Sequence, residues 1–155
     1  MNKIIAILCV VFIMATANQV SADTLHRMPT KATSGDRYSE MSIKVKSCTA
    51  VGDDVDIVFI VTNNSSKERD VTFQWGNAFD DEGNNYRSIS YGPGNEVASR
   101  SYYNIIFEPE VPVKVKVRIK KVAEEASVMK IVKITTMEEN LFATLKNIPI
   151  DRDSE

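Results

Sequence analysis

The chain has 155 residues, of which 43% are hydrophobic and 8% aromatic, and its formal net charge is −2. This balance argues against nucleic acid as a partner, because phosphate backbones are bound by surfaces with an excess of Lys and Arg. Beyond the first 22 residues no apolar run reaches the roughly 18 residues that a spanning helix needs, so we expect no membrane span.

The first 22 residues have the pattern of a secretory leader. Lys3 precedes an apolar run from Ile4 to Ala15, and Ala22 closes a short stretch of small residues that suits signal peptidase. We therefore expect cleavage near Ala22 and an extracytoplasmic mature protein, either periplasmic or secreted. The predicted organisation is a signal peptide over 1–22, a flexible arm over 23–38, a β-sandwich over 39–151 and a C-terminal tail over 152–155.

The cysteines exclude a disulfide framework within the mature chain. Cys9 lies in the predicted leader, which leaves Cys48 without an intramolecular partner. A fold of this size must then rest on its apolar core. We expect the Cys48 side chain to be buried, as free cysteines usually are.

Alternating apolar and polar residues predict strands along most of the remaining chain. Met41, Ile43 and Val45 alternate with polar residues, for example, and turns rich in Gly, Asn and Asp separate one such segment from the next. Only the short segments 123–129 and 138–145 have a pattern compatible with helix. Seven or eight strands without βαβ alternation predict an all-β fold, an antiparallel sandwich of the immunoglobulin-like type.

Several turn motifs support this class. The chain carries a strand that ends in Thr62-Asn63-Asn64-Ser65, followed by the hairpin Asp80-Asp-Glu-Gly-Asn-Asn-Tyr86 and a closing Leu145-Lys-Asn-Ile-Pro-Ile150. Over residues 41–150 it resembles immunoglobulin-like β-sandwich domains of bacterial secreted proteins and lipoproteins. That resemblance implies an extracytoplasmic, non-catalytic accessory module, and it supplies no catalytic residues.

Enzyme chemistry finds no support in the motifs. The single histidine, His26, lies in the predicted arm, where it would not be held against a nucleophile. No paired metal-ligating cysteines and no G-x-S-x-G or H-E-x-x-H motif are present. We therefore predict that the protein is not an enzyme.

The acidic turn is the best candidate for a metal site. Carboxylate and amide oxygens are calcium ligands, but Gly83 does not fall where an EF-hand loop places its glycine. The alternative is a hairpin turn, in which Asp, Gly and Asn are favoured for their backbone geometry. We expect no cofactor, with calcium as the open alternative, and the candidate ligands are Asp80, Asp81, Glu82 and Asn84.

A second candidate is a strip of cations formed by Lys114, Lys116, Arg118 and Lys120, which share one strand face because side chains repeat every two residues. It could attract anionic glycans, lipid head groups or an acidic partner. The alternatives are a solvated face or an edge strand that lysines protect against pairing.

Aromatic residues provide a third candidate. Trp75 alternates in phase with Val71 and Phe73, which predicts a place in the core, although an exposed Trp75 would favour sugar binding. Adjacent tyrosines on a strand point to opposite faces, so one of two should be exposed. The predicted binding surface consists of Tyr91, Asn95 in the 92–100 loop, Tyr102, Tyr103 and, if exposed, Trp75.

These patterns predict a secreted or periplasmic, non-catalytic binding module whose partner is a protein or glycan at the cell envelope. Rigid sandwiches commonly display function on their loops. The alternative is an accessory domain that binds carbohydrate or calcium through the 80–85 turn and the 91–103 region. A small hydrolase without a detectable motif is a third alternative.

Overall fold

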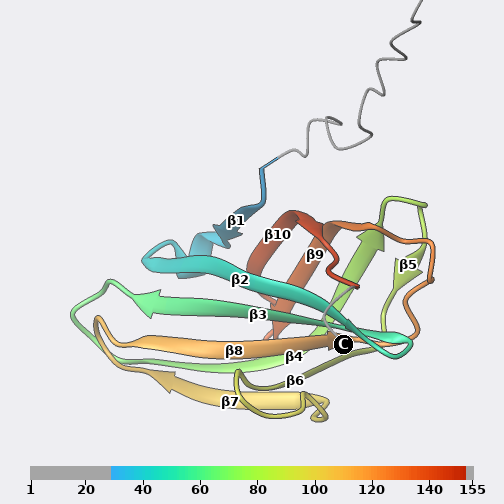
Figure 1. The fold of residues 1–155 in the computed structure, drawn as a ribbon. Coiled ribbons are helices and arrows are strands. Elements are labelled where there is room, and N and C mark those ends of the chain that lie inside the picture. The colour runs from blue at the N-terminus through green and yellow to red at the C-terminus, as the bar shows by residue number, and fades with distance from the viewer. Residues whose placement is uncertain (1–28, 153–155) are drawn as a thin grey trace, which may run out of the picture.

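The part of the chain described by the computed structural model, residues 29–152, folds into two antiparallel sheets that pack on each other (Figure 1). This confirms the predicted all-β sandwich. The predicted leader and residues 153–155 of the predicted tail lie outside the described residues.

Sheet A contains both the first and the last strand of the described chain. Its strand order is β1-β10-β9-β4-β5, and β7 also pairs with β4. The 3₁₀ helix η2 (Asp36–Tyr38) follows the first strand. The strands are β1 (Lys31–Ser34), β4 (Arg69–Asp80), β5 (Asn85–Tyr86), β7 (Tyr102–Phe107), β9 (Val128–Thr136) and β10 (Leu141–Pro149).

Sheet B has the order β2-β3-β8-β6, so β8 is an interior strand. A tight turn joins its first two strands, and Gly52 adopts the left-handed conformation there, with φ of 59°. The strands are β2 (Met41–Val51), β3 (Asp54–Asn63), β6 (Ile89–Pro93) and β8 (Pro112–Ile119).

Aromatic side chains fill the space between the two sheets. Phe73 on β4 packs edge-on against Phe142 on β10, with ring centroids 4.7 Å apart, and stacks on Tyr91 of sheet B at 5.6 Å. Cys48 is buried in the same core, as expected. Burial raises the pKa of its thiol to about 12, although the nearby Arg152 acts in the opposite direction.

The start of the described chain differs from the prediction. Residues 31–38 were expected to belong to a flexible arm, but β1 pairs with β10 from Lys31 opposite Lys146 to Ser34 opposite Ala143. The segment shows no apolar period because it is a short edge strand from which Ala32 packs on the core. The strand count therefore rises to ten within the described residues.

The two segments with a helix-compatible pattern, 123–129 and 138–145, contain no helix. Their ends belong instead to β9 and β10. Among the residues described, no helix is long and apolar enough to cross a membrane.

Candidate functional site

Trp75 lies in a β-bulge in the middle of β4. Phe73 is opposite Thr136 of β9 and Gly76 is opposite Ile134, so two residues of β4 face one residue of β9. Phe73 and Gly76 both face the core, and Gln74 and Trp75 lie between them. Trp75 is consequently 50% exposed, and the prediction that alternation would bury it is wrong.

The backbone of this bulge is unusual for a large aromatic residue. Trp75 has φ of 59°, in the left-handed region that costs a residue with a Cβ about 1–2 kcal/mol. Such outliers persist only where the surrounding structure enforces them. Here the neighbouring strands provide that enforcement.

Two hydroxyl groups hold the bulge. The hydroxyl of Tyr91, which reaches across from sheet B, donates to the Trp75 carbonyl, and the Thr135 hydroxyl donates to the Gln74 carbonyl at 2.8 Å. Gly76 leaves room for this clamp, because a Cβ there would lie 3.0 Å from the Tyr91 hydroxyl oxygen and 2.9 Å from the Lys133 carbonyl oxygen. Burial raises the pKa of Tyr91, so its phenol keeps the proton that it donates.

Tyr91 is therefore not a surface residue. It was expected to contribute to a binding surface, but its side chain is fully buried. The irregular 92–100 stretch that follows it had suggested exposure, whereas the ring itself belongs to β6 and points between the sheets. Tyr91 is thus buried where exposure was predicted, and Trp75 is half-exposed where burial was predicted.

Trp75 belongs to a row of side chains across sheet A. Tyr102 on β7 is opposite Gln74, Thr135 follows on β9, and Leu141 on β10 is opposite Thr135. Tyr102 is 64% exposed, and Leu141 is exposed as well. We call this row, Gln74, Trp75, Tyr102, Thr135 and Leu141, the aromatic face.

The other two residues of the predicted surface lie elsewhere. Tyr103 is half-buried near Phe73, and Arg100 lies over its ring at 5.9 Å, so the adjacent tyrosines do point to opposite sides. Asn95 is exposed on the loop between β6 and β7. That loop folds onto β6, where Ala98 packs close to Gly92.

The carboxylates of the acidic turn accept hydrogen bonds from the chain itself. The buried Asp80 carboxylate accepts hydrogen bonds from the backbone N–H groups of Asn84 at 2.8 Å and Glu82 at 3.0 Å, from the Asn84 side-chain amide at 2.9 Å and from the Tyr86 hydroxyl at 2.6 Å. Burial by itself raises the pKa of Asp80, but these donors outweigh it and leave that pKa below its usual value.

Asp81 has a similar role. Its carboxylate accepts from the N–H groups of Ser127 and Val128 at 3.0 and 3.1 Å and ties the turn to the start of β9. Burial opposes ionisation there too, and the hydrogen bonds from Ser127 and Val128 still lower the pKa of Asp81. Glu82 is exposed, and no three His, Cys, Asp or Glu side chains within 29–152 could hold a metal ion together. The candidate calcium ligands thus form a self-bonded hairpin turn.

The cation strip lies on an interior strand, which removes the explanation that its lysines protect an edge. Arg118 forms a bidentate ion pair with Asp56 on β3, in which two guanidinium nitrogens lie 2.6 and 2.8 Å from the two carboxylate oxygens. The Lys116 ammonium is 4.0 Å from the same carboxylate. Lys114 and Lys120 are exposed.

Of the aromatic face, the sequence pointed to Tyr102 and to Trp75 if exposed, and it missed Gln74, Thr135 and Leu141. A signal was present in Gly76, because a glycine inside a strand often marks a bulge, and a bulge reverses the alternation beyond it. His26, the one histidine, lies outside the described residues. No family model, curated protein or solved structure matches the chain.

Proposed function

We propose that this protein is a non-catalytic, extracytoplasmic binding module that recognises a partner protein through the aromatic face. The observation that carries the proposal is Trp75, half-exposed in a strained conformation that Tyr91 and Thr135 hold in place. Folding gains little from such an arrangement, whereas exposed Trp and Tyr are the residues that most often dominate protein interfaces.

The surroundings of Trp75 support a protein partner. Besides Tyr102 and Leu141, the exposed apolar side chains include Met137, whose N–H donates to the Thr72 carbonyl, and Ile106 on β7. Ile106 alternates in phase with Tyr102 along β7, so the two share one side of sheet A. Protein interfaces combine such apolar anchors with polar groups at their rim.

Carbohydrate is the second candidate ligand of this face. The exposed Trp75 ring is available for stacking on a sugar, and Gln74 adds an amide next to it. The rest of the proposal follows from the leader-like N-terminus, which supports an extracytoplasmic location, and from the motif resemblance, which supports an immunoglobulin-like accessory domain.

Intrinsic fluorescence tests the proposal directly, because Trp75 is the only tryptophan in the sequence. We expect a cell-envelope protein retained by the immobilised wild type to be lost from Trp75→Ala and, once purified, to shift the Trp75 emission to shorter wavelength. Val51→Ala, which truncates an exposed apolar side chain of sheet B, is the control and should retain the partner.

Neutral oligosaccharides form the second arm of this experiment. An emission shift with an oligosaccharide and none with any retained protein would favour the carbohydrate candidate. If Trp75→Ala retained the same proteins as the wild type and no oligosaccharide changed the emission, the aromatic face would not be the recognition surface.

A further inference from the structure

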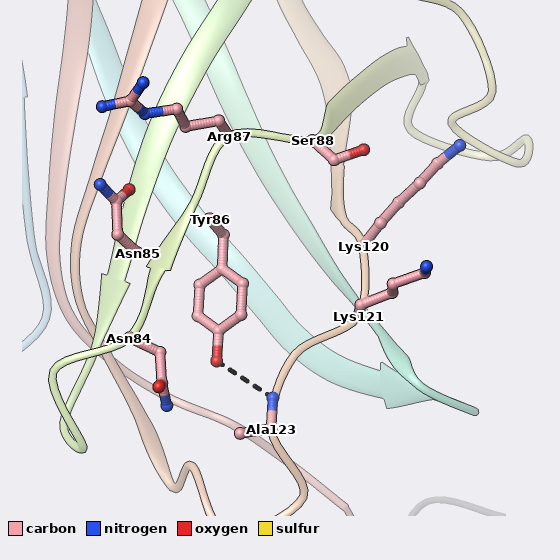
Figure 2. Close-up of a pocket in the computed structure, with 8 residues that line it drawn as sticks. All are labelled: Asn84, Asn85, Tyr86, Arg87, Ser88, Lys120, Lys121 and Ala123. Atoms are coloured by element: carbon pink, nitrogen blue, oxygen red, sulfur yellow. Dashed lines mark hydrogen bonds between the residues drawn. The ribbon is translucent and has the colours of Figure 1, made fainter.

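A hollow lies where the chain crosses from sheet A to sheet B between β5 and β6, on a different part of the molecule from the aromatic face. Figure 2 shows the Tyr86 ring at its centre, with two lysines that follow β8 on one side and polar residues of the β5 segment on the other. No lining side chain is acidic, and the polar ones include Asn84, Asn85, Arg87, Lys120 and Lys121.

The floor of the hollow is fixed. The half-buried Tyr86 donates its hydroxyl proton to Asp80 at 2.6 Å and accepts a hydrogen bond from the Ala123 N–H at 3.0 Å. With both functions of the hydroxyl engaged, the ring is held in one orientation. A fixed ring presents a flat apolar surface to whatever occupies the hollow.

The three cationic side chains of the hollow are not held in ion pairs. Arg87, Lys120 and Lys121 are exposed, and their side chains form no ion pair in the described structure. Two carboxylates lie close by, since Asp80 accepts from Tyr86 and Asp54 accepts from the Lys121 backbone N–H at 3.1 Å, and both keep their negative charge. Neither forms an ion pair with the three cations, whose side chains stay free to contact an anion in the hollow.

A row of cations extends along sheet B, and Asp56 compensates one of its charges through Arg118 and Lys116. Lys114, Lys116 and Arg118 follow one another on the outer side of β8 at intervals of about 6.7 Å, and Lys120 continues the row into the hollow. From Lys114 to Lys120 this row is about 20 Å long. It occurs in a chain whose overall charge is negative, so it does not follow from a basic composition.

We propose that the hollow binds an acidic sugar residue of an anionic polysaccharide, whose chain continues along β8. The cations would bind the sugar carboxylate, the amide of Asn85 and the carbonyl oxygen of the Asn84 side chain would bind its hydroxyls, and the Tyr86 ring would contact its C–H face, while the Asn84 amide nitrogen donates to Asp80 at 2.9 Å. A linear row fits a polymer, and an aromatic floor with amide groups fits a sugar better than it fits a lipid surface.

Calorimetric titration with polygalacturonate oligosaccharides at low salt tests this inference, with neutral dextran as the reference ligand. We expect the triple variant Arg87→Gln, Lys120→Gln, Lys121→Gln to bind at least about tenfold more weakly, because each lost contact is a charge-assisted hydrogen bond. The matched control removes the same charge from exposed lysines of sheet A, in Lys31→Gln, Lys130→Gln, Lys146→Gln, and should bind like the wild type.

Three outcomes would overturn the inference. Equal losses in the two triple variants would mean attraction by net charge alone. Absence of polygalacturonate binding by the folded wild type would exclude the acidic sugar, and binding to phosphatidylglycerol vesicles in its place would assign the cations to a membrane surface. None of these results depends on Trp75, so failure here would leave the proposed role of the aromatic face untouched.

Discussion

The acidic turn and the Trp75 bulge are both departures from regular strand structure, and they treat their side chains in opposite ways. In the turn, the charged atoms of Asp80 and Asp81 are bonded to the chain itself. In the bulge, the backbone carbonyls are satisfied while the large indole ring is left half in solvent. The hydrogen bonds of the turn stabilise the fold, whereas the exposure of the Trp75 ring adds nothing to its stability.

This contrast is the basis of the different roles that we propose for the two regions. A buried carboxylate with several donors stabilises the fold, because removing it leaves those donors unsatisfied. An exposed ring on a strained backbone contributes little to folding, and for that reason we propose that Trp75 binds a partner. The contrast makes quantitative predictions for both regions.

The largest effect is expected at the turn. Asp80→Ala should lower the free energy of unfolding by about 3 kcal/mol, because the N–H groups of Glu82 and Asn84 and the Tyr86 hydroxyl lose their acceptor. Chemical denaturation measures this loss. Glu82→Ala, on the same turn but exposed, is the control, and an equal loss there would remove the contrast.

The same substitution predicts a pH dependence. The pKa of Asp80 in the unfolded chain is near 4, and in the folded protein it is lower. The contribution of Asp80 to stability is therefore complete above the unfolded pKa and is lost as the pH falls through the folded pKa. The stability difference between wild type and Asp80→Ala should therefore narrow in acid. A difference that grew as the pH fell would contradict the hydrogen-bonded carboxylate.

A smaller effect is expected at the clamp. Tyr91→Phe leaves the Trp75 carbonyl without its donor inside the sandwich, which should lower the free energy of unfolding by about 1–2 kcal/mol. Tyr102→Phe, which alters an exposed ring, should be neutral. A change of Trp75 emission in the first variant and none in the second would show that the clamp sets the position of the indole.

The smallest effect is expected at Trp75 itself. Trp75→Gly relieves the left-handed backbone but loses the buried half of the indole, and we expect the free energy of unfolding to stay within about 1 kcal/mol of the wild type. Differential scanning calorimetry would detect a larger change. A loss of several kcal/mol would make Trp75 a structural residue and would remove the basis of the proposed binding surface.

Much of the sandwich was predictable because strands with one face in the core alternate regularly. In β8, Val115, Val117 and Ile119 are buried, as the period of two requires. The strand β1 was not predicted, because only one of its four residues, Ala32, is an apolar side chain that packs on the core. A strand this short is too brief to show the alternation of apolar and polar residues.

The candidate site was less predictable, for a local reason. Alternation assigns Trp75 to the core only if β4 is regular, and the extra residue at the bulge reverses the assignment for everything beyond it. Tyr91 illustrates the converse, since its ring is positioned by contacts with Phe73 and Trp75, which lie far from it in sequence. No local pattern carries that information.

The burial of Cys48 has a consequence for the chemistry of the protein outside the cytoplasm, where we propose that it works. Burial raises the pKa of this thiol to about 12, so it stays protonated at neutral pH. The thiolate is the form that attacks disulfides and oxidants, so the folded chain is protected from mixed disulfides while it stays closed. Reaction of Cys48 with a thiol reagent would therefore report how often the structure around β2, the edge strand of sheet B that carries it, opens.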